Sequence, residues 1–247
     1  MLHMTDLDAL PPGLAAAWGV AEPSGRRGPK PAHSVDEIVA AASSLADEEG
    51  IAAASLPRVA AAVGVSTNAL YRYVSSKEEL IVLVADRAWG EPPQLPSGDW
   101  RAAARSWARR LFERFSARPW LLDVPATVPL TPHNAAWLDV LITALEPTGM
   151  APDEMLDCAY LLDSHARYGA NLRRSRPTPA ALRGAGPERA GTVGAVRGFL
   201  DEQLRARGLD AVARVMKDPS FLAEEPSIDG FEFGLARILD GIEAHLQ

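Results

Sequence analysis

The sequence predicts an all-α protein made of an N-terminal three-helix, helix-turn-helix domain and a C-terminal helical bundle. Three observations support this class. Apolar residues recur at helical spacing along most of the 247 residues, and strand signals are absent. Ser-x-x-Glu capping boxes at Ser34 and Ser76 mark helix starts. GEPPQLPSGD, residues 90 to 99, breaks the helical pattern. We expect domains at residues 34–90 and 97–247, preceded by a leader and basic arm at residues 1–33.

Composition bounds the protein further. Hydrophobic residues make up 47% of the chain, enough for a full core without metals or disulfides. Cys158 is the single cysteine, so an internal disulfide is impossible, and no Cys/His cluster has zinc spacing. No apolar segment is long enough to span a bilayer, and a signal-peptide pattern is lacking. We expect a cytoplasmic protein with no metal, no cofactor and no membrane partner.

The first 33 residues divide into a leader and an arm. Residues 1–23 contain prolines and no Lys or Arg, and we expect them to be disordered. Residues 24–33, SGRRGPKPAH, form a Pro- and Gly-rich arm that carries Arg26, Arg27 and Lys30. Two interpretations of the arm are open: it reaches a neighbouring DNA minor groove, or it is a solvated linker.

The first helix of the N-terminal domain is expected between Ser34 and Gly50. Ser34 and Glu37 form its capping box, and its apolar stripe comprises Val35, Ile38, Val39, Ala42, Leu45 and Ala46. Its far end is acidic, with Asp47, Glu48 and Glu49, whereas Arg58, Arg72 and Lys77 lie in or beside the next helices. We expect a small positive face backed by a negative one, which suits specific docking because the net charge of the chain is −7.

The stretch LPRVAAAVGVSTNALYRYVSSK, residues 56 to 77, has the pattern of two short helices joined by a glycine turn. Gly64 supplies the left-handed position that ends the first helix, whose small apolar face comprises Ala60, Ala61 and Val63. Ser66 caps the second helix. Three residues of base-reading type then point away from the packed side: Thr67, Asn68 and Arg72.

A connecting helix follows, opened by the capping box of Ser76 and Glu79 and running through Trp89. Just before it, Leu70 and Val74 share one helical face and are the better core candidates. Tyr71 and Tyr73 are then free to lie toward a DNA backbone, although one of them could equally be a core aromatic.

In the C-terminal domain, apolar residues recur at helical spacing. Its first helix carries Trp100, Ala104, Trp107, Leu111 and Phe115 and ends at Pro119. Thr131 and Pro132 open a second helix with Trp137, Leu138, Leu141 and Leu145. Pro152 opens a third, with Leu161, His165, Tyr168 and Leu172 on one face. Residues 173–187 are a polar loop, followed by helices over 192–205 and near the C-terminus.

Three segments of the N-terminal domain, LADEEG, LPRVAAAVGVS and ALYRYVSSKEEL, resemble in order and spacing the DNA-binding domain of the TetR/AcrR family of transcriptional regulators. The resemblance implies a homodimer that binds double-stranded DNA at a palindromic operator. It also implies roles for single residues. Ser55, Tyr71, Tyr73 and Lys77 match phosphate-contacting positions, Thr67, Asn68 and Arg72 match positions facing base edges, and Arg58 fits either class.

The last helix, FEFGLARILDGIEAHL, is similar to the closing helix of many such regulators, which pairs across a two-fold axis into a four-helix bundle. Gly234 and Gly241 lie one heptad apart, a spacing that favours a helix packed closely against the backbone. The alternative is packing within the chain. The expected dimer interface comprises Val196, Leu200, Phe231, Gly234, Leu235, Ile238, Gly241 and Ile242.

The family resemblance places a signal-receiving site in the C-terminal domain. A cavity lined by aromatic residues and a few polar groups would suit a small, mostly apolar effector. The expected lining comprises Trp107, Leu111, Phe115, Trp120, Trp137, Leu141, Tyr160, Asp163, His165, Tyr168 and Asn171. The alternative is that these residues are plain core.

The sequence therefore predicts a ligand-responsive transcriptional regulator, most simply a repressor released from DNA by its effector. Two alternatives stay open, a helical adaptor that binds protein and a DNA-binding protein without small-molecule gating. An enzyme is disfavoured, and no catalytic residue is assigned, because metalloprotease, Walker and nucleophile-elbow motifs are missing and the five histidines are scattered.

Overall fold

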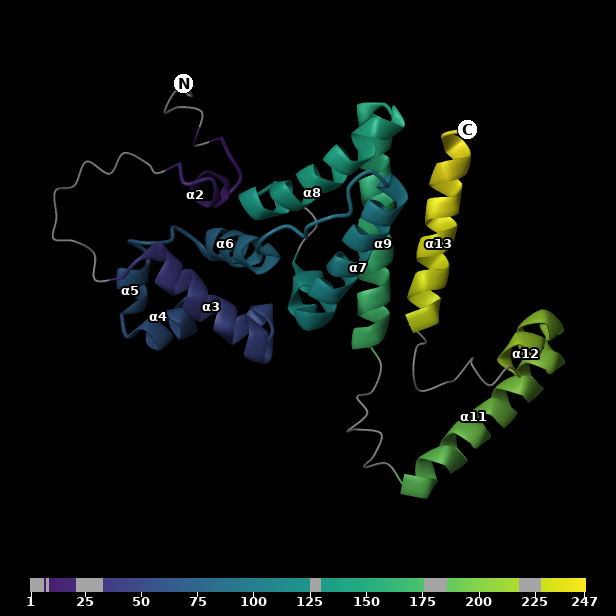
Figure 1. Cartoon of the computed structure of the whole chain (residues 1–247). Helices are drawn as coiled ribbons and strands as arrows, with labels where there is room; N and C mark the ends of the chain where they lie inside the picture. Colours follow the sequence, from purple (N-terminus) through teal and green to yellow (C-terminus); the bar gives the residue numbers. More distant parts are fainter. Residues whose placement is uncertain (1–6, 8, 21–32, 125–129, 176–185, 218–227) are drawn as a thin grey trace. The chain divides into compact units, whose positions relative to one another are not determined.

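A computed structural model of the chain describes residues 7, 9–20, 33–124, 130–175, 186–217 and 228–247, and within these ranges it contains helices and no strand (Figure 1). The predicted all-α class is confirmed. The chain forms two compact units, residues 1–171 with 234–247, and residues 172–233. No described helix is long and apolar enough to cross a membrane.

The N-terminal domain contains α3 (Val35–Glu49), the 3₁₀ turn η1 (Ile51–Ala53), α4 (Leu56–Val63) and α5 (Thr67–Leu70). The capping box at Ser34 is confirmed, and α3 ends at Gly50, whose φ is 86°. A small core joins the helices through fully buried side chains, Ile38 and Ala42 from α3, Val59 and Ala60 from α4, and Leu70 and Val74 after the turn.

The turn between α4 and α5 is built as predicted. Gly64 has φ 75° and ends α4, while the Ser66 hydroxyl accepts a hydrogen bond from the Ala69 N–H. The predicted apolar face of α4 was wrong in part, because Ala61 is exposed and Leu56 is buried. Leu56 follows Ser55 at the helix start and is buried with Val59 and Ala60, so the buried face lies toward the N-terminus of α4.

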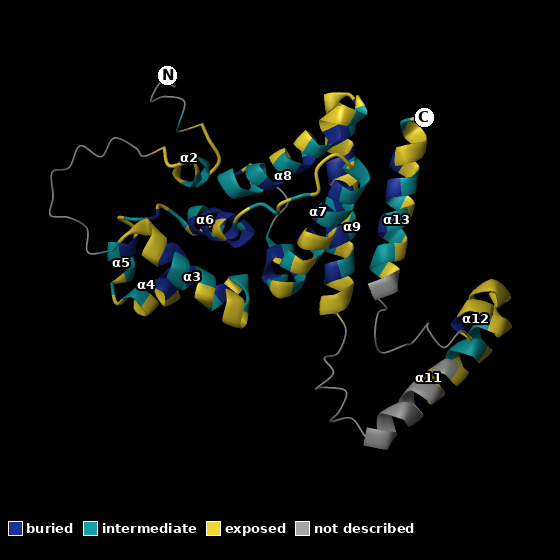
Figure 2. Ribbon diagram, in the orientation of Figure 1, coloured by how far each residue is buried: buried dark blue, intermediate teal, exposed yellow. Residues whose placement is uncertain are grey.

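The connecting helix is α6 (Lys77–Trp89), with the predicted bounds. Between Leu80 and Trp89 only Arg87 is exposed (Figure 2), so α6 is enclosed by its neighbours. The Ser76 hydroxyl caps the helix as expected, accepting from the Glu79 N–H. The Glu79 carboxylate turns to the backbone N–H of Ser75, 2.9 Å away, so the second bond of the predicted box forms one residue earlier.

The leader was predicted to be disordered, and the structure contradicts this for residues 9–20. A short helix, α2 (Leu14–Ala17), packs on α6. A Cβ atom on Gly13 would lie 2.9 Å from the Cβ of Val82, and the Trp18 indole donates to the Leu130 carbonyl at 3.0 Å. The basic arm, including Arg26, Arg27 and Lys30, lies outside the described residues.

The C-terminal domain begins with α7 (Trp100–Ala117) and η2 (Pro119–Asp123), followed by α8 (Pro132–Leu145), η3 (Glu146–Thr148) and α9 (Pro152–Arg174). The buried carboxylate of Asp86 on α6 accepts a hydrogen bond from the His133 N–H at 2.9 Å. It therefore satisfies one of the orphan donors at the start of α8.

The last helix, α13 (Ile228–His245), runs antiparallel to α9. Gly234 near its start lies against His165, and His245 at its end meets Glu154 at 2.9 Å. Arg101 of α7 pairs with Asp240 and Glu243 of α13, and these ion pairs join the two helices.

The second unit contains α11 (Gly186–Ala206), which includes the predicted helix over 192–205, and α12 (Asp210–Met216). Residues 176–185 of the predicted polar loop lie outside the described part of the chain.

Candidate DNA-binding face and effector site

The side chains predicted to contact DNA lie on the outer side of the helix-turn-helix. Asn68, Tyr71, Arg72 and Lys77 are exposed, Tyr71 by 52% of its surface, and Ser55 and Thr67 are half-buried. Their exposure follows from the packing of Leu70 and Val74, both of which are almost fully buried on the opposite side. The arrangement presents a polar, aromatic and cationic set on one short segment, the chemistry that phosphates and base edges require.

Tyr73 differs from Tyr71. It is half-buried, and its hydroxyl accepts a hydrogen bond from the backbone N–H of His33 at 3.4 Å. Tyr73 therefore ties the end of the helix-turn-helix to the residue that closes the arm, while Tyr71 points outward without such a tie.

Arg58 does not stand apart from the acidic end of α3, so the expected separation of charges was wrong at this residue. Its two terminal nitrogens donate to the Glu49 carboxylate at 2.8 and 2.6 Å. These hydrogen bonds hold the pKa of Glu49 below its ordinary value and raise the pKa of Arg58. The short η1 turn brings the end of α3 beside the start of α4, a contact that sequence distance alone does not reveal.

Six of the predicted effector residues fill the core of the C-terminal domain: Trp107, Leu111, Phe115, Trp120, Trp137 and Leu141, each at most 4% exposed. Trp137 and Trp107 meet edge to face with ring centroids 6.5 Å apart, and the Trp107 indole donates to the Trp137 carbonyl at 2.7 Å. Trp89 of α6 joins the cluster, 5.7 Å from Trp137 and 5.9 Å from Phe115. This packing is that of a core.

The predicted residues of α9 lie mostly on its open side. Tyr160 and Tyr168 are each 66% exposed and Asn171 is exposed, so their expected place in an interior cavity is wrong for the described chain. The opposite side of α9 is buried instead, through Cys158, Ala159, Leu162, Ala166 and Ala170. The buried side therefore carries mostly alanine, and the open side carries the tyrosines. Asp163 is half-buried, and it pairs with Arg167 at 2.6 Å.

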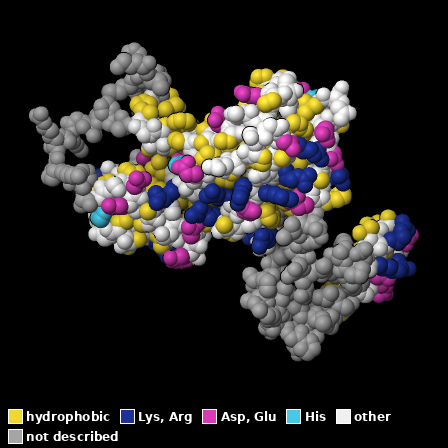
Figure 3. All heavy atoms as spheres, in the orientation of Figure 1, with side chains coloured by type: hydrophobic (Ala, Val, Ile, Leu, Met, Phe, Trp, Pro, Cys, Tyr) yellow, Lys and Arg dark blue, Asp and Glu magenta, His cyan; other side chains and the backbone are white. Residues whose placement is uncertain are grey.

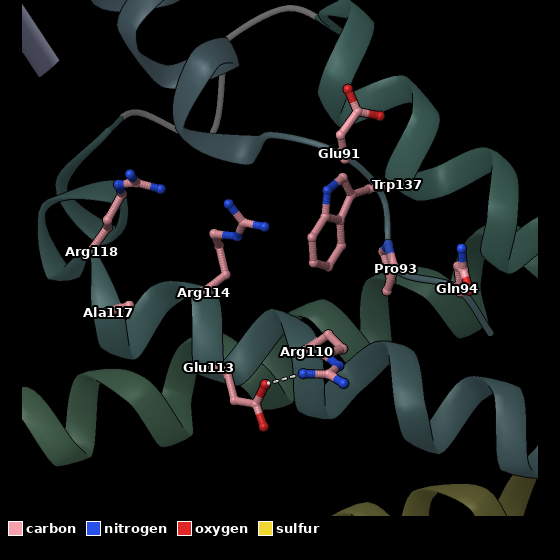
Figure 4. Close-up of a pocket in the computed structure, with 9 residues that line it drawn as sticks. All are labelled: Glu91, Pro93, Gln94, Arg110, Glu113, Arg114, Ala117, Arg118 and Trp137. Carbon is pink, nitrogen blue, oxygen red and sulfur yellow. Dashed lines mark hydrogen bonds and ion pairs between the residues drawn. The ribbon is translucent and has the colours of Figure 1, made fainter. Parts of the chain in front are cut away.

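A pocket of about 420 Å³ lies between α7 and the segment that follows α6 (Figure 4). Of the predicted effector residues, only Trp137 lines it. The rest of its wall comprises Glu91, Pro93, Gln94, Arg110, Glu113, Arg114, Ala117 and Arg118. The sequence carries a signal for this pocket in the arginines at 110, 114 and 118, which are spaced four apart on one helical face and belong to no aromatic stripe.

The pocket side chains also cap the end of α6. Arg114 donates to the Ala88 carbonyl at 3.0 Å and Arg118 to the same oxygen at 3.4 Å. The Trp137 indole donates to the carbonyls of Trp89 and Gly90, each at 3.1 Å. These carbonyls belong to the last turn, which has no donors within the helix, so the C-terminal domain supplies them.

A second contact joins the two domains at the end of α3. The Asp47 carboxylate accepts from the Trp120 indole at 2.7 Å and from Arg118 at 3.2 Å. Trp120 was predicted to line an effector cavity, and its polar edge instead holds the DNA-binding domain. Arg118 touches both α3 and α6, so it lies at the junction between the domains.

The predicted dimer residues divide into inward and outward groups. Leu235 and Ile242 are 0% and 7% exposed within their own chain, which favours packing inside the chain for these two side chains. Gly234 packs against His165 within the chain. Gly241 is exposed with open space beside it, Val196 is exposed, and Leu200, Phe231 and Ile238 are half-buried.

The surface over α6 and α7 is rich in basic side chains with acidic ones among them (Figure 3). Among the described residues, no group of His, Cys, Asp and Glu is placed to hold a metal ion.

Comparison with known proteins agrees with the geometry. Residues 38–84 match the family of bacterial regulatory proteins, tetR family, and residues 92–246 match a tetracyclin repressor-like C-terminal domain. The chain is 35% identical over 221 residues to the HTH-type transcriptional repressor DrrR1 of Streptomyces coeruleorubidus, a match covering 88% of this chain and 80% of that protein.

Solved structures show the same fold. Apo ActR from Streptomyces coelicolor, 24% identical, superposes with a TM-score of 0.70 over 89% of this chain and 98% of its own. ActR in complex with actinorhodin is 25% identical, with a TM-score of 0.67 over 87% of this chain and 98% of that one.

Proposed function

The chain belongs to the TetR family of bacterial regulatory proteins and is a DNA-binding transcriptional repressor, not an enzyme, and we propose that it binds a palindromic operator as a homodimer until a small, mostly apolar effector releases it. The observation that carries this proposal is the outward set of Asn68, Tyr71, Arg72 and Lys77 behind the buried pair Leu70 and Val74. Arg72 and Asn68 read base edges, and Tyr71 and Lys77 hold phosphates.

A homodimer gives the palindrome its reason. Two recognition segments related by a two-fold axis reach successive major grooves when they lie about 34 to 36 Å apart. Each unit offers a surface to a second copy. The second unit exposes the apolar side chains of Val196, Phe199, Val212 and Val215, and the first unit exposes Gly241.

The effector acts on the C-terminal domain, the part of the chain that matches the tetracyclin repressor-like family. The structural relative ActR has been solved with actinorhodin, which supports a small-molecule effector here. Effector and operator then favour different positions of α6. By linkage, the operator weakens effector binding by the same factor as the effector weakens operator binding.

Gel-shift and footprinting experiments on DNA upstream of the gene test this function. We expect protection of an inverted repeat and at least about fivefold weaker binding by Arg72→Ala with unchanged helicity, because a bidentate base contact is worth about 1 to 3 kcal/mol. Arg207→Ala removes an equal charge from the second unit and serves as the control. A footprint without symmetry, or equal binding by the two variants, contradicts the proposal.

One alternative has an observation of its own. The aromatic core around Trp107 and Trp137 is filled, which favours a repressor without small-molecule gating. Operator binding can be measured with and without an extract that contains the metabolites of the host. Equal affinity under both conditions would support this alternative.

A further inference from the structure

The charge of the pocket beside α7 is not balanced among the described residues. Arg110 pairs with Glu113 at 3.1 Å, and Arg118 pairs with Asp47 at 3.2 Å. Arg114 has no carboxylate partner in the described part of the chain. Its guanidinium meets one carbonyl and lies 5.3 Å from the centre of the Trp137 ring.

The remaining acid of the pocket does not fill this role. In Figure 4, the Glu91 carboxylate lies beyond Trp137 and is directed away from the three arginines. Arg114, by contrast, points between Arg118 and Trp137 toward the open hollow of the pocket. Burial and then the charge of Arg118 lower the pKa of Arg114, so this cation lacks the solvation and the counter-charge it would have in water.

We propose that this pocket binds an aromatic carboxylate, whose carboxylate accepts hydrogen bonds from Arg114 and whose ring lies against Pro93 and the edge of Trp137 that reaches the pocket wall. The inference rests on the proposed function and deepens it, because it assigns the effector a site and a chemical class. Arg fits a carboxylate with two parallel N–H donors, and the volume of about 420 Å³ suits a molecule of two or three rings. A mostly apolar body with one acid group satisfies both parts of the wall.

The site is coupled to the DNA-binding domain through shared donors. Arg114 and Arg118 both hold the Ala88 carbonyl at the end of α6, and Arg118 also holds Asp47 at the end of α3. A carboxylate that takes up the Arg114 donors leaves the last turn of α6 with fewer partners. The connecting helix then moves more easily between positions, which is the change that operator release requires.

The backbone at Gly90 lies close to Arg114, at the junction between α6 and the segment that leads into α7. Its φ is 54°, and a Cβ atom there would lie 3.1 Å from the Arg114 Nη1. The backbone after α6 therefore approaches the guanidinium closely. A displacement of Arg114 would change its contact with the segment that leads into α7.

Calorimetric titration of the full-length protein without DNA tests the site. The probe is 2-naphthoate, and 2-naphthamide is its neutral match. We expect naphthoate to bind at least tenfold more tightly than the amide, and Arg114→Gln to remove that preference. Arg205→Gln, which loses an exposed and already paired arginine outside the pocket wall, is expected to bind naphthoate within about twofold of the wild type, because exposed pairs contribute little.

A second pair of variants leaves the caps of α6 intact in case Arg114→Gln fails to fold. Ala117 is exposed at the end of α7 and lines the pocket. Ala117→Glu is expected to weaken naphthoate at least tenfold by repulsion and by occupying Arg114, while Ala117→Gln, of equal size, weakens it much less.

Equal binding of naphthoate and naphthamide, no binding of either, or equal effects of Ala117→Glu and Ala117→Gln overturns the inference. A symmetric operator footprint with release by an uncharged molecule would then leave the proposed function standing, so the two failures are separable.

Discussion

At the scale of single residues, the pair of Glu49 and Arg58 sets how much positive charge the helix-turn-helix presents. Arg58 is nearly half exposed, yet both of its terminal nitrogens are held by the Glu49 carboxylate. A phosphate must compete with that carboxylate, so Arg58 contributes less to DNA than its position suggests. Arg72 is exposed and belongs to the set that faces outward from the turn.

Glu49→Gln is therefore expected to strengthen DNA binding. The freed Arg58 gains one phosphate contact, which steepens the dependence of log affinity on log salt by about 0.9. Fluorescence anisotropy with operator DNA over a series of salt concentrations measures this slope. Glu48→Gln, which removes the neighbouring charge without breaking the pair, is the control, and identical slopes for both variants would refute the role of the pair.

At the scale of elements, α13 contains two glycines, Gly234 and Gly241, that lie one heptad apart and have different surroundings. A Cβ atom on Gly234 would lie 2.4 Å from the Cε1 of His165, whereas no atom of the described residues lies within 4 Å of one on Gly241. Gly234 thus permits the close contact of α13 with α9. Gly241 is exposed among the described residues, so its surface is available to a packing partner.

The two glycine-to-alanine variants are expected to diverge. Gly234→Ala lowers the free energy of unfolding by about 1 to 3 kcal/mol, because the added methyl overpacks against His165. Gly241→Ala raises the stability of the isolated chain by up to about 1 kcal/mol through helix propensity, and weakens the dimer if a partner helix lies there. Urea unfolding and sedimentation measure both quantities. A similar loss of stability in both variants would show that the contact with His165 is not the cause.

At the scale of the whole chain, the two domains are joined by hydrogen bonds between side chains that lie far apart in the sequence. The helical spacing of apolar residues does not predict these contacts. Asp47 at the end of α3 binds both Trp120 and Arg118, and the end of α6 is held by Arg114, Arg118 and Trp137. The helix-turn-helix is therefore tied to the C-terminal domain at two points, so a change near α7 is transmitted to both α3 and α6.

Asp47→Asn is expected to loosen the DNA-binding domain while leaving the rest of the fold intact. It removes the ion pair with Arg118 and weakens the bond from Trp120, a loss of about 1 kcal/mol at this half-exposed site. Hydrogen exchange read by mass spectrometry should show faster exchange in the second half of α3 and in η1, with α9 unchanged. Trp120→Phe should show the same pattern. Exchange rates in α3 and η1 equal to those of the wild type in both variants would contradict the coupling.

Local chemistry made much of the fold predictable. The bounds of α6, the turn at Gly64 and the caps at Ser34 and Ser66 were predicted because each depends on residues within one helical turn of each other. The exposure of Tyr71 and Arg72 was predictable for a related reason, since Leu70 and Val74 define the only strongly apolar side of that segment.

The sequence by itself thus determined the helices, the helix-turn-helix and the family, because capping, glycine conformation and helical period act between near neighbours in the chain. Only the tertiary structure decided which side of α9 is buried, that residues 9–20 pack on α6, and that Arg114 and Arg118 close the end of that helix. An amphipathic helix with Ala on one side and Tyr on the other can bury either. The choice depends on how closely its neighbours approach, and that distance is set by residues far away in sequence.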